Sequence, residues 1–128
     1  MIPRQYLNQP VLVVDDFSTM RKIIKNSLQS MGFTTIIEAQ DGVDAWEKLE
    51  KESFVLIVSD WNMPRMQGID LLKKVKADPR YSKIPFIMVT AEGQKECVLD
   101  AIKNGVNNYV VKPFTTEVLE QKIQQVLK

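Results

Sequence analysis

Five short apolar runs, each about as long as a β-strand, alternate along this chain with five segments of helical periodicity. The apolar runs lie near residues 11–14, 35–39, 54–59, 86–90 and 108–111. The helical segments, where apolar side chains recur every three or four residues, lie near residues 20–31, 42–51, 68–76, 95–104 and 116–127. Such alternation favours an α/β fold, in which helices cover both faces of a mostly parallel sheet.

The polarity of the apolar runs predicts their order in the sheet. The first, third and fourth runs are almost wholly apolar, which is typical of central parallel strands that are buried on both faces. The second run contains Glu38, and the fifth begins with Asn107 and Asn108, so both favour edge positions. We expect a doubly wound (βα)5 sandwich of the flavodoxin-like class with strand order 2-1-3-4-5. Its ligand site should lie beside the switch point between strands 1 and 3.

Length and composition fit a single globular domain. The chain has 128 residues, 45% of them hydrophobic and 26% charged, with a net charge of +1. No basic run indicates nucleic acid as a partner, and no apolar stretch is long enough for a signal peptide or for membrane insertion. The single cysteine, Cys97, excludes an internal disulfide and fits a reducing compartment, so we expect a cytoplasmic protein. One domain should span residues 1–128, with residues 1–9 as a loosely held N-terminal extension.

The sequence contains no histidine, which excludes a Ser-His-Asp triad and any histidine-based metal site. Its five glycines lie too far apart for a dinucleotide-binding or Walker-type loop. Any chemistry must therefore rely on carboxylates, lysine, hydroxyl groups and a bound ion.

Acidic residues follow two of the apolar runs that we place side by side. Asp15 and Asp16 follow the first run, and Asp60 follows the third. Three carboxylates at one crevice repel one another unless they are protonated or bridged by a cation. A site with only oxygen ligands suits Mg²⁺ or Mn²⁺, and the backbone carbonyl of Asn62 could add a further ligand.

Two other polar residues should reach the same crevice. Thr90 ends the fourth run and Lys112 follows the fifth. Taken singly, an Asp pair after a strand is usually a turn or a helix cap, and a lysine is usually a solvated charge. Together, a carboxylate nucleophile, a metal, a cation and a hydroxyl donor are what phosphoryl transfer requires, because positioning and charge stabilisation supply most of its catalysis.

Four stretches around these residues resemble the receiver domain of bacterial response regulators, and most closely its single-domain chemotaxis members. They are residues 13–21, 59–64, 88–92 and 108–115. The resemblance extends over residues 11–128. The single-domain chemotaxis receiver is itself a standard example of the strand order 2-1-3-4-5, so the resemblance and the strand argument are not independent.

The resemblance implies a role for each polar residue of the crevice. Asp60 would be the phosphoacceptor. Asp15 and Asp16 would bind Mg²⁺ together with Asp60 and the backbone carbonyl of Asn62. Lys112 would pair with the phosphoryl group. A phosphoacceptor of this kind is not an enzyme, although it has intrinsic self-phosphorylation and self-dephosphorylation chemistry.

The resemblance also implies a switch. Thr90 would move toward the phosphoryl group while the ring of Tyr109 turns inward. Asn62 and Glu92 would tune the lifetime of the acyl phosphate, and the Lys112–Pro113 peptide bond would be cis. Arg65 and Gln67 depart from the family, whose members carry other polar residues there, one of them acidic. We expect this departure to affect phosphatase contacts and the dephosphorylation rate.

No output domain is expected after residue 128, so the output should be a surface formed by the last two helical segments and the strand between them. Its residues would be Lys95, Val98, Ile102, Tyr109, Val111, Phe114 and Lys122. The implied partners of this monomer are a CheA-like histidine kinase, a FliM-like flagellar motor switch protein and a phosphatase.

Three alternatives remain at this level. The chain could act as a phosphate sink or in a two-component pathway unrelated to motility. A Mg²⁺-dependent phosphatase of the haloacid-dehalogenase kind is disfavoured because that pattern requires an acidic residue where Asn62 stands. A structural pseudo-receiver is disfavoured because no part of the pocket is missing.

Overall fold

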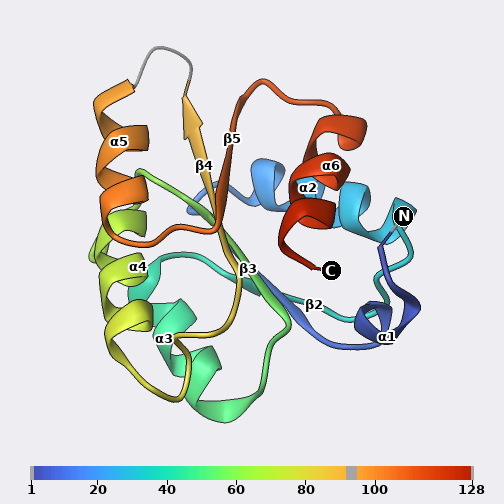
Figure 1. Cartoon of the computed structure of the whole chain (residues 1–128), viewed down its shortest axis with the longest axis horizontal. Helices are drawn as coiled ribbons and strands as arrows, with labels where there is room; N and C mark the ends of the chain where they lie inside the picture. The colour runs from blue at the N-terminus through green and yellow to red at the C-terminus, as the bar shows by residue number, and fades with distance from the viewer. Residues whose placement is uncertain (1, 92–94, 128) are drawn as a thin grey trace.

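Five parallel strands form a single sheet in the order β2-β1-β3-β4-β5, which confirms the predicted order and both predicted edges (Figure 1). The computed structural model describes residues 2–91 and 95–127. The strands are β1 (Val11–Val14), β2 (Ile36–Ala39), β3 (Leu56–Asp60), β4 (Phe86–Ala91) and β5 (Asn108–Lys112). Because every strand pair is parallel, all carboxyl ends meet at one edge of the sheet.

Helices cover both faces of this sheet (Figure 1). One layer contains α3 (Gly42–Lys51), α4 (Gly68–Ala77) and α5 (Lys95–Lys103), and the other contains α2 (Ser18–Ser30) and α6 (Thr116–Val126). No helix in the described part of the chain is long and apolar enough to cross a bilayer.

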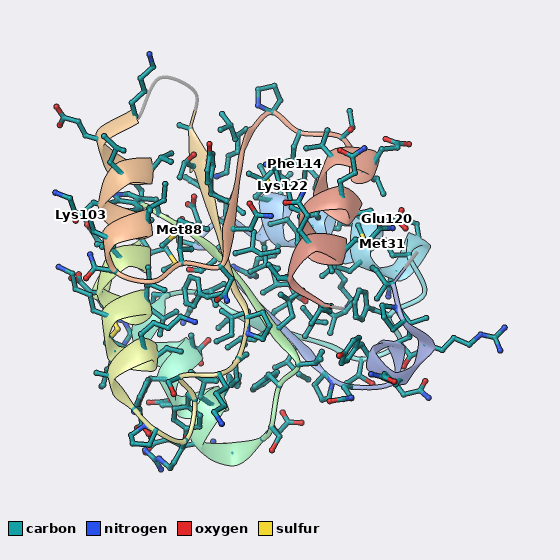
Figure 2. The ribbon with its side chains drawn as sticks, viewed as in Figure 1. Met31, Met88, Lys103, Phe114, Glu120 and Lys122 are labelled. Carbon is teal, nitrogen blue, oxygen red and sulfur yellow. The ribbon has the colours of Figure 1, made fainter. Side chains whose placement is uncertain are left out.

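The two helix layers enclose two separate cores because successive strand side chains point to opposite faces. In β1, Leu12 and Val14 belong to the core on the α3–α5 side, whereas Val11 and Val13 belong to the core on the α2–α6 side. Met88, labelled in Figure 2, is fully buried on the α3–α5 side. Burial of both faces explains why the central strands are almost continuously apolar.

The N-terminal segment differs from the expectation that residues 1–9 are loosely held. It forms a short helix, α1 (Arg4–Leu7), and Ile2 is buried in the α2–α6 core. The carbonyl oxygen of Leu7 accepts the N–H of Thr34 at 3.1 Å. The Leu7 side chain lies against Gly32, where an added Cβ would approach it to 3.1 Å. Two apolar side chains, Ile2 and Leu7, therefore dock this segment.

Gly32 lies just after the C-terminal end of α2. Its φ of +109° lies in the left-handed region, which costs little only for glycine. Gly32 N–H donates to the carbonyl of Gln29 at 3.0 Å, and Phe33 N–H donates to the carbonyl of Leu28 at 3.2 Å. This pair of hydrogen bonds is a Schellman motif, which satisfies the last carbonyls of the helix.

Candidate functional site

The carboxyl edge of the sheet brings the predicted polar residues together. Asp15 and Asp16 follow β1, while Asp60 and Lys112 are the last residues of β3 and β5, and Thr90 lies near the end of β4. Asp60 is thus part of its strand, one residue beyond the predicted end of that run. Since β1, β3, β4 and β5 are successive neighbours in the sheet, these side chains meet beside the switch point.

Three carboxylates form the centre of the site. Asp15, Asp16 and Asp60 each offer one oxygen, and these oxygens all lie within 4.8 Å of one another. Among the described residues, Asp15 Oδ2 and Asp16 Oδ1 are buried without a hydrogen-bond partner. Unpaired buried carboxylate oxygens are costly unless a cation supplies the missing charge. An all-oxygen donor set of this kind therefore fits a hard divalent cation such as Mg²⁺.

Burial perturbs two of these acids. It raises the pKa of Asp15 to about 6; the N–H of Phe17, which donates to Asp15 Oδ1 at 2.9 Å, opposes the rise, and the charge of Asp60 adds to it. Burial also raises the pKa of Asp60, against the hydrogen bond from Lys112. A bound divalent cation would favour the ionised carboxylates, so binding it should release protons below about pH 6.

Lys112 provides the positive charge of the site. Its Nζ lies 3.1 Å from Asp60 Oδ1 and 3.8 Å from Asp15 Oδ2. Thr90 is 1% exposed, and its Oγ1 has no hydrogen-bond partner in the described part of the chain. Lys112 is thus placed to meet additional negative charge at Asp60, whereas Thr90 lines a neighbouring cavity on the same edge of the sheet.

An open cavity of about 520 Å³ gives access to the cluster. Asp16, Asp60, Asn62 and Lys112 line it, as expected for the site. Five further residues line it: Phe17, Met63, Pro64, Gln67 and Ala91. None of them was predicted as a site residue, and only Gln67 was named in the sequence analysis, as a difference from the family. Phe17 is 66% exposed, which is unusual for a phenylalanine and marks the rim of the cavity.

Close backbone packing positions Asp60. Gly68 N–H donates to the carbonyl of Trp61 at 2.9 Å. A Cβ on Gly68 would collide with the carbonyl oxygen of Asp60 and approach Met88 Sδ to 2.9 Å. Only glycine at the start of α4 allows this approach.

Arg21 positions the acidic pair and was missed in the sequence. Its Nη1 donates to the carbonyl of Asp15 at 2.6 Å, and its Nε donates to Glu38 Oε1 at 3.1 Å. The arginine thus connects the loop after β1 to the edge strand β2. The position of an arginine in the sequence carries no sign of such a link.

A second cavity, of about 380 Å³, is lined by most residues of the predicted output surface. Lys95, Val98, Ile102, Tyr109 and Val111 line it with Thr90, Ala91 and Leu99. Leu99, which the sequence did not single out, is 60% exposed.

The last two predicted output residues, Phe114 and Lys122, lie on the α6 side of β5 (Figure 2). Phe114 instead packs against the α2–α6 core, and Lys122 Nζ lies 5.2 Å from the ring centroid of Tyr109. The Lys112–Pro113 peptide bond is cis, as the resemblance implies. Glu92 lies outside the described residues.

Comparison with known proteins agrees with this geometry. Residues 11–124 match the family described as response regulator receiver domain. The chain is 55% identical to chemotaxis protein CheY1 of Helicobacter pylori, over 91% of this chain and 95% of that protein. It is 53% identical to a CheY homologue of Campylobacter jejuni, over 91% of each chain. The structure of the Vibrio cholerae chemotaxis response regulator CheY4 superposes with a TM-score of 0.85 at 35% identity, covering 94% of this chain and 99% of that one.

Proposed function

The chain belongs to the response regulator receiver domain family, and from this premise we propose that it is a chemotaxis response regulator that accepts a phosphoryl group on Asp60. One observation carries the proposal. Lys112 Nζ lies 3.1 Å from Asp60 Oδ1 in a cluster of three carboxylates, two of whose buried oxygens have no hydrogen-bond partner among the described residues. The relatives named as chemotaxis proteins support the pathway.

Asp15, Asp16, Asp60 and the backbone carbonyl of Asn62 would hold the metal, which we propose to be Mg²⁺, with Mn²⁺ as a substitute. When bound, the metal neutralises the carboxylates and stabilises charge on the phosphoryl oxygens during transfer. Asn62 is exposed and lines the cavity together with Asp16 and Asp60.

Asp60 acts as the nucleophile. One of its carboxylate oxygens forms a bond to phosphorus, and the bond between phosphorus and the leaving group breaks. With a phosphohistidine donor, the imidazole nitrogen keeps the electron pair of the broken P–N bond. The ring leaves as neutral imidazole when its other nitrogen carries a proton, and otherwise takes a proton from solvent. Lys112 stays beside the reacting carboxylate throughout and offers a cation to the transferred oxygens.

Phosphorylation would change the output surface through Thr90. The acyl phosphate adds about one further negative charge at Asp60. The unpaired hydroxyl of Thr90 then gains an acceptor, and Tyr109 can move into the space that Thr90 leaves, because both residues line the same cavity. The change is a population shift, so the unphosphorylated protein should also visit the active form.

We propose a histidine kinase, CheA-like, as the phosphodonor and a flagellar motor switch protein as the target of the output surface. Phosphorylation should raise affinity for a motor-switch peptide. Phosphorylation without any gain in affinity would instead favour a phosphate sink or a pathway unrelated to motility. We also propose that the chain does not turn over small phosphomonoesters as an enzyme.

The phosphoacceptor is tested with acetyl phosphate and Mg²⁺. The wild-type chain should gain the mass of one phosphoryl group, and Asp60→Asn should gain none. Trp61 adjoins Asp60 and is 9% exposed, so its fluorescence should respond first to Mg²⁺ and then to acetyl phosphate. Equal labelling of the two proteins would overturn the assignment.

A further inference from the structure

A buried carboxylate connects the loop after β3 to the start of α3. Arg65 donates from Nε to Asp41 Oδ2 at 2.8 Å, and its Nη2 lies 2.7 Å from the same oxygen. The side chain of Asp41 is 4% exposed, whereas that of Arg65 is 55% exposed. Asp41 Oδ1 accepts the N–H of Asp44 at 2.9 Å and so caps α3. Arg65 therefore binds a carboxylate that α3 already holds in place.

Backbone contacts support the same junction. Gly42 N–H donates to the carbonyl of Met66 at 3.2 Å. The Met66 side chain fills the space beside Gly42, where an added Cβ would lie 2.6 Å from Met66 Cβ. The middle of the loop is thus attached to the N-terminus of α3 by one ion pair, one hydrogen bond and one close packing contact.

The conformation of Arg65 shows that the ion pair opposes a local cost. Its φ is +64°, in the left-handed region that disfavours residues with a Cβ. Glycine or asparagine would adopt this conformation more easily. The ion pair with a buried carboxylate offsets the cost at this position.

The loop fixed in this way carries one side of the candidate site. Asn62, Met63, Pro64 and Gln67 all line the cavity beside the acidic cluster. Both ends of the loop are anchored, by Asp60 in β3 and by Gly68 at the start of α4. Arg65 and Met66 supply the attachment between these ends.

We propose that the Arg65–Asp41 ion pair is a latch that positions the loop after β3 so that the backbone carbonyl of Asn62 faces the metal site. Arg65 and Asp41 are then positioning residues for metal binding, although neither belongs to the acidic cluster. The proposal rests on the proposed function, in which the site takes Mg²⁺.

The test compares Mg²⁺ affinity and loop protection in matched variants. Arg65→Gln and Asp41→Asn each remove the ion pair, and asparagine can still cap α3. Arg80→Gln is the control, because Arg80 Nη2 lies 2.9 Å from Asp78 Oδ2 in an ion pair located before β4. Mg²⁺ is titrated by calorimetry, and hydrogen exchange is followed at the amides of Gly42, Met66 and Gly68 without metal.

Each latch variant should weaken Mg²⁺ binding about tenfold, near the lower end of what removing an orienting partner of a metal ligand costs. The double variant should weaken it no further, because both changes break one interaction. The latch variants should speed exchange at Gly42 and Met66 but not within the sheet. Arg80→Gln should match wild type in both measurements.

The outcomes separate the two proposals. Wild type that binds Mg²⁺ while Arg65→Gln and Asp41→Asn bind it equally well would overturn the latch alone. Faster loop exchange with unchanged affinity would also overturn it, since the pair would then be purely structural. Wild type that binds no Mg²⁺ would overturn both the latch and the metal-dependent site. Arg65→Gly removes the ion pair but adopts the left-handed backbone without strain. If this variant binds Mg²⁺ as tightly as wild type, the ion pair is not the positioning element.

Discussion

Three buried side-chain oxygens, Asp15 Oδ2, Asp16 Oδ1 and Thr90 Oγ1, have no hydrogen-bond partner among residues 2–91 and 95–127. An unsatisfied buried polar group costs about 1–3 kcal/mol. All three lie at the same edge of the sheet, beside Asp60 and Lys112. The two carboxylate oxygens are suited to a cation, and the hydroxyl is suited to an anion. Without such ligands, the three unpaired oxygens destabilise the folded protein.

Thr90→Val tests this cost for the hydroxyl. Valine keeps the β-branched shape and removes the unpaired Oγ1, so the unphosphorylated protein should become more stable by about 1 kcal/mol. Thr90→Ser keeps the hydroxyl but loses a methyl group, and should lose about 1 kcal/mol instead. Urea unfolding without metal measures both. Destabilisation by valine would show that the hydroxyl already has a partner.

The pKa of Asp15 predicts how stability depends on pH in the absence of metal. The pKa of Asp15 is about 6 in the folded protein, against an ordinary value of 3.8 in the unfolded chain. The folded state therefore binds this proton more tightly than the unfolded state. Stability from Asp15 is then greatest below pH 3.8 and is lost as pH rises toward 6. Asparagine does not titrate. As pH rises through this range, the free energy of unfolding of Asp15→Asn should therefore increase relative to that of wild type by about 1–3 kcal/mol.

Urea unfolding in EDTA at about pH 4.5 and about pH 7.5 measures this gain as the difference between the two proteins. A difference that stays constant with pH would contradict the raised pKa.

At the scale of elements, the site depends on where strands end and the next helices begin. Asp60 ends β3, and Gly68 begins α4 in contact with the Asp60 carbonyl oxygen. The helix is thus packed directly onto the backbone of Asp60. A side chain in place of the Gly68 hydrogen would have to move the backbone of Asp60. Backbone atoms can move aside less easily than the end of a flexible side chain.

Gly68→Ala should therefore cost at least about 2 kcal/mol, as expected when overpacking moves backbone. Gly105→Ala is the matched control, because its nearest neighbouring atom would lie 3.7 Å away and only its φ of +88° is unfavourable. That control should lose about 1 kcal/mol. Thermal and urea unfolding compare the two variants, and equal losses would show that the loop adapts without moving Asp60.

The sequence predicted these elements well where burial alone decides the pattern. Glu38 and Asn108 identified the edge strands, because a polar residue in a strand reflects a local constraint. The pairings of Arg21 with Glu38 and of Arg65 with Asp41 could not be predicted. A long charged side chain can reach many partners, and only the folded chain decides which one lies within reach.

At the scale of the whole molecule, the site and the proposed output surface meet at the end of β4. Ala91 lines both cavities, and Thr90 lines the cavity that contains Tyr109. A change of charge at Asp60 would therefore need no long relay to reach the proposed output surface. The residues that we propose to respond are neighbours on adjacent strands, because Thr90 of β4 pairs with Val111 of β5.

The N-terminal segment contacts the other end of the sheet, where the strands begin. Removing this segment tests whether the two ends of the sheet are independent of each other. Deleting residues 1–9 removes the buried side chain of Ile2 and the Leu7 contact with Gly32. Loss of one buried aliphatic side chain costs about 2–5 kcal/mol in a core, so the truncated protein should unfold at clearly lower urea concentration. Ile2→Ala should reproduce much of this loss.

Mg²⁺ should stabilise the full-length and truncated proteins equally, because it binds only the folded state and its site lies at the other end of the sheet. At a concentration one hundred times the dissociation constant, the gain is about 2.7 kcal/mol. Asp16→Asn removes a carboxylate of the metal site and should show a smaller gain in both backgrounds. Urea unfolding with and without Mg²⁺ measures all four proteins. A Mg²⁺ gain that shrinks on truncation would mean that α1 supports the acidic cluster through β1, and that the two ends of the sheet are coupled.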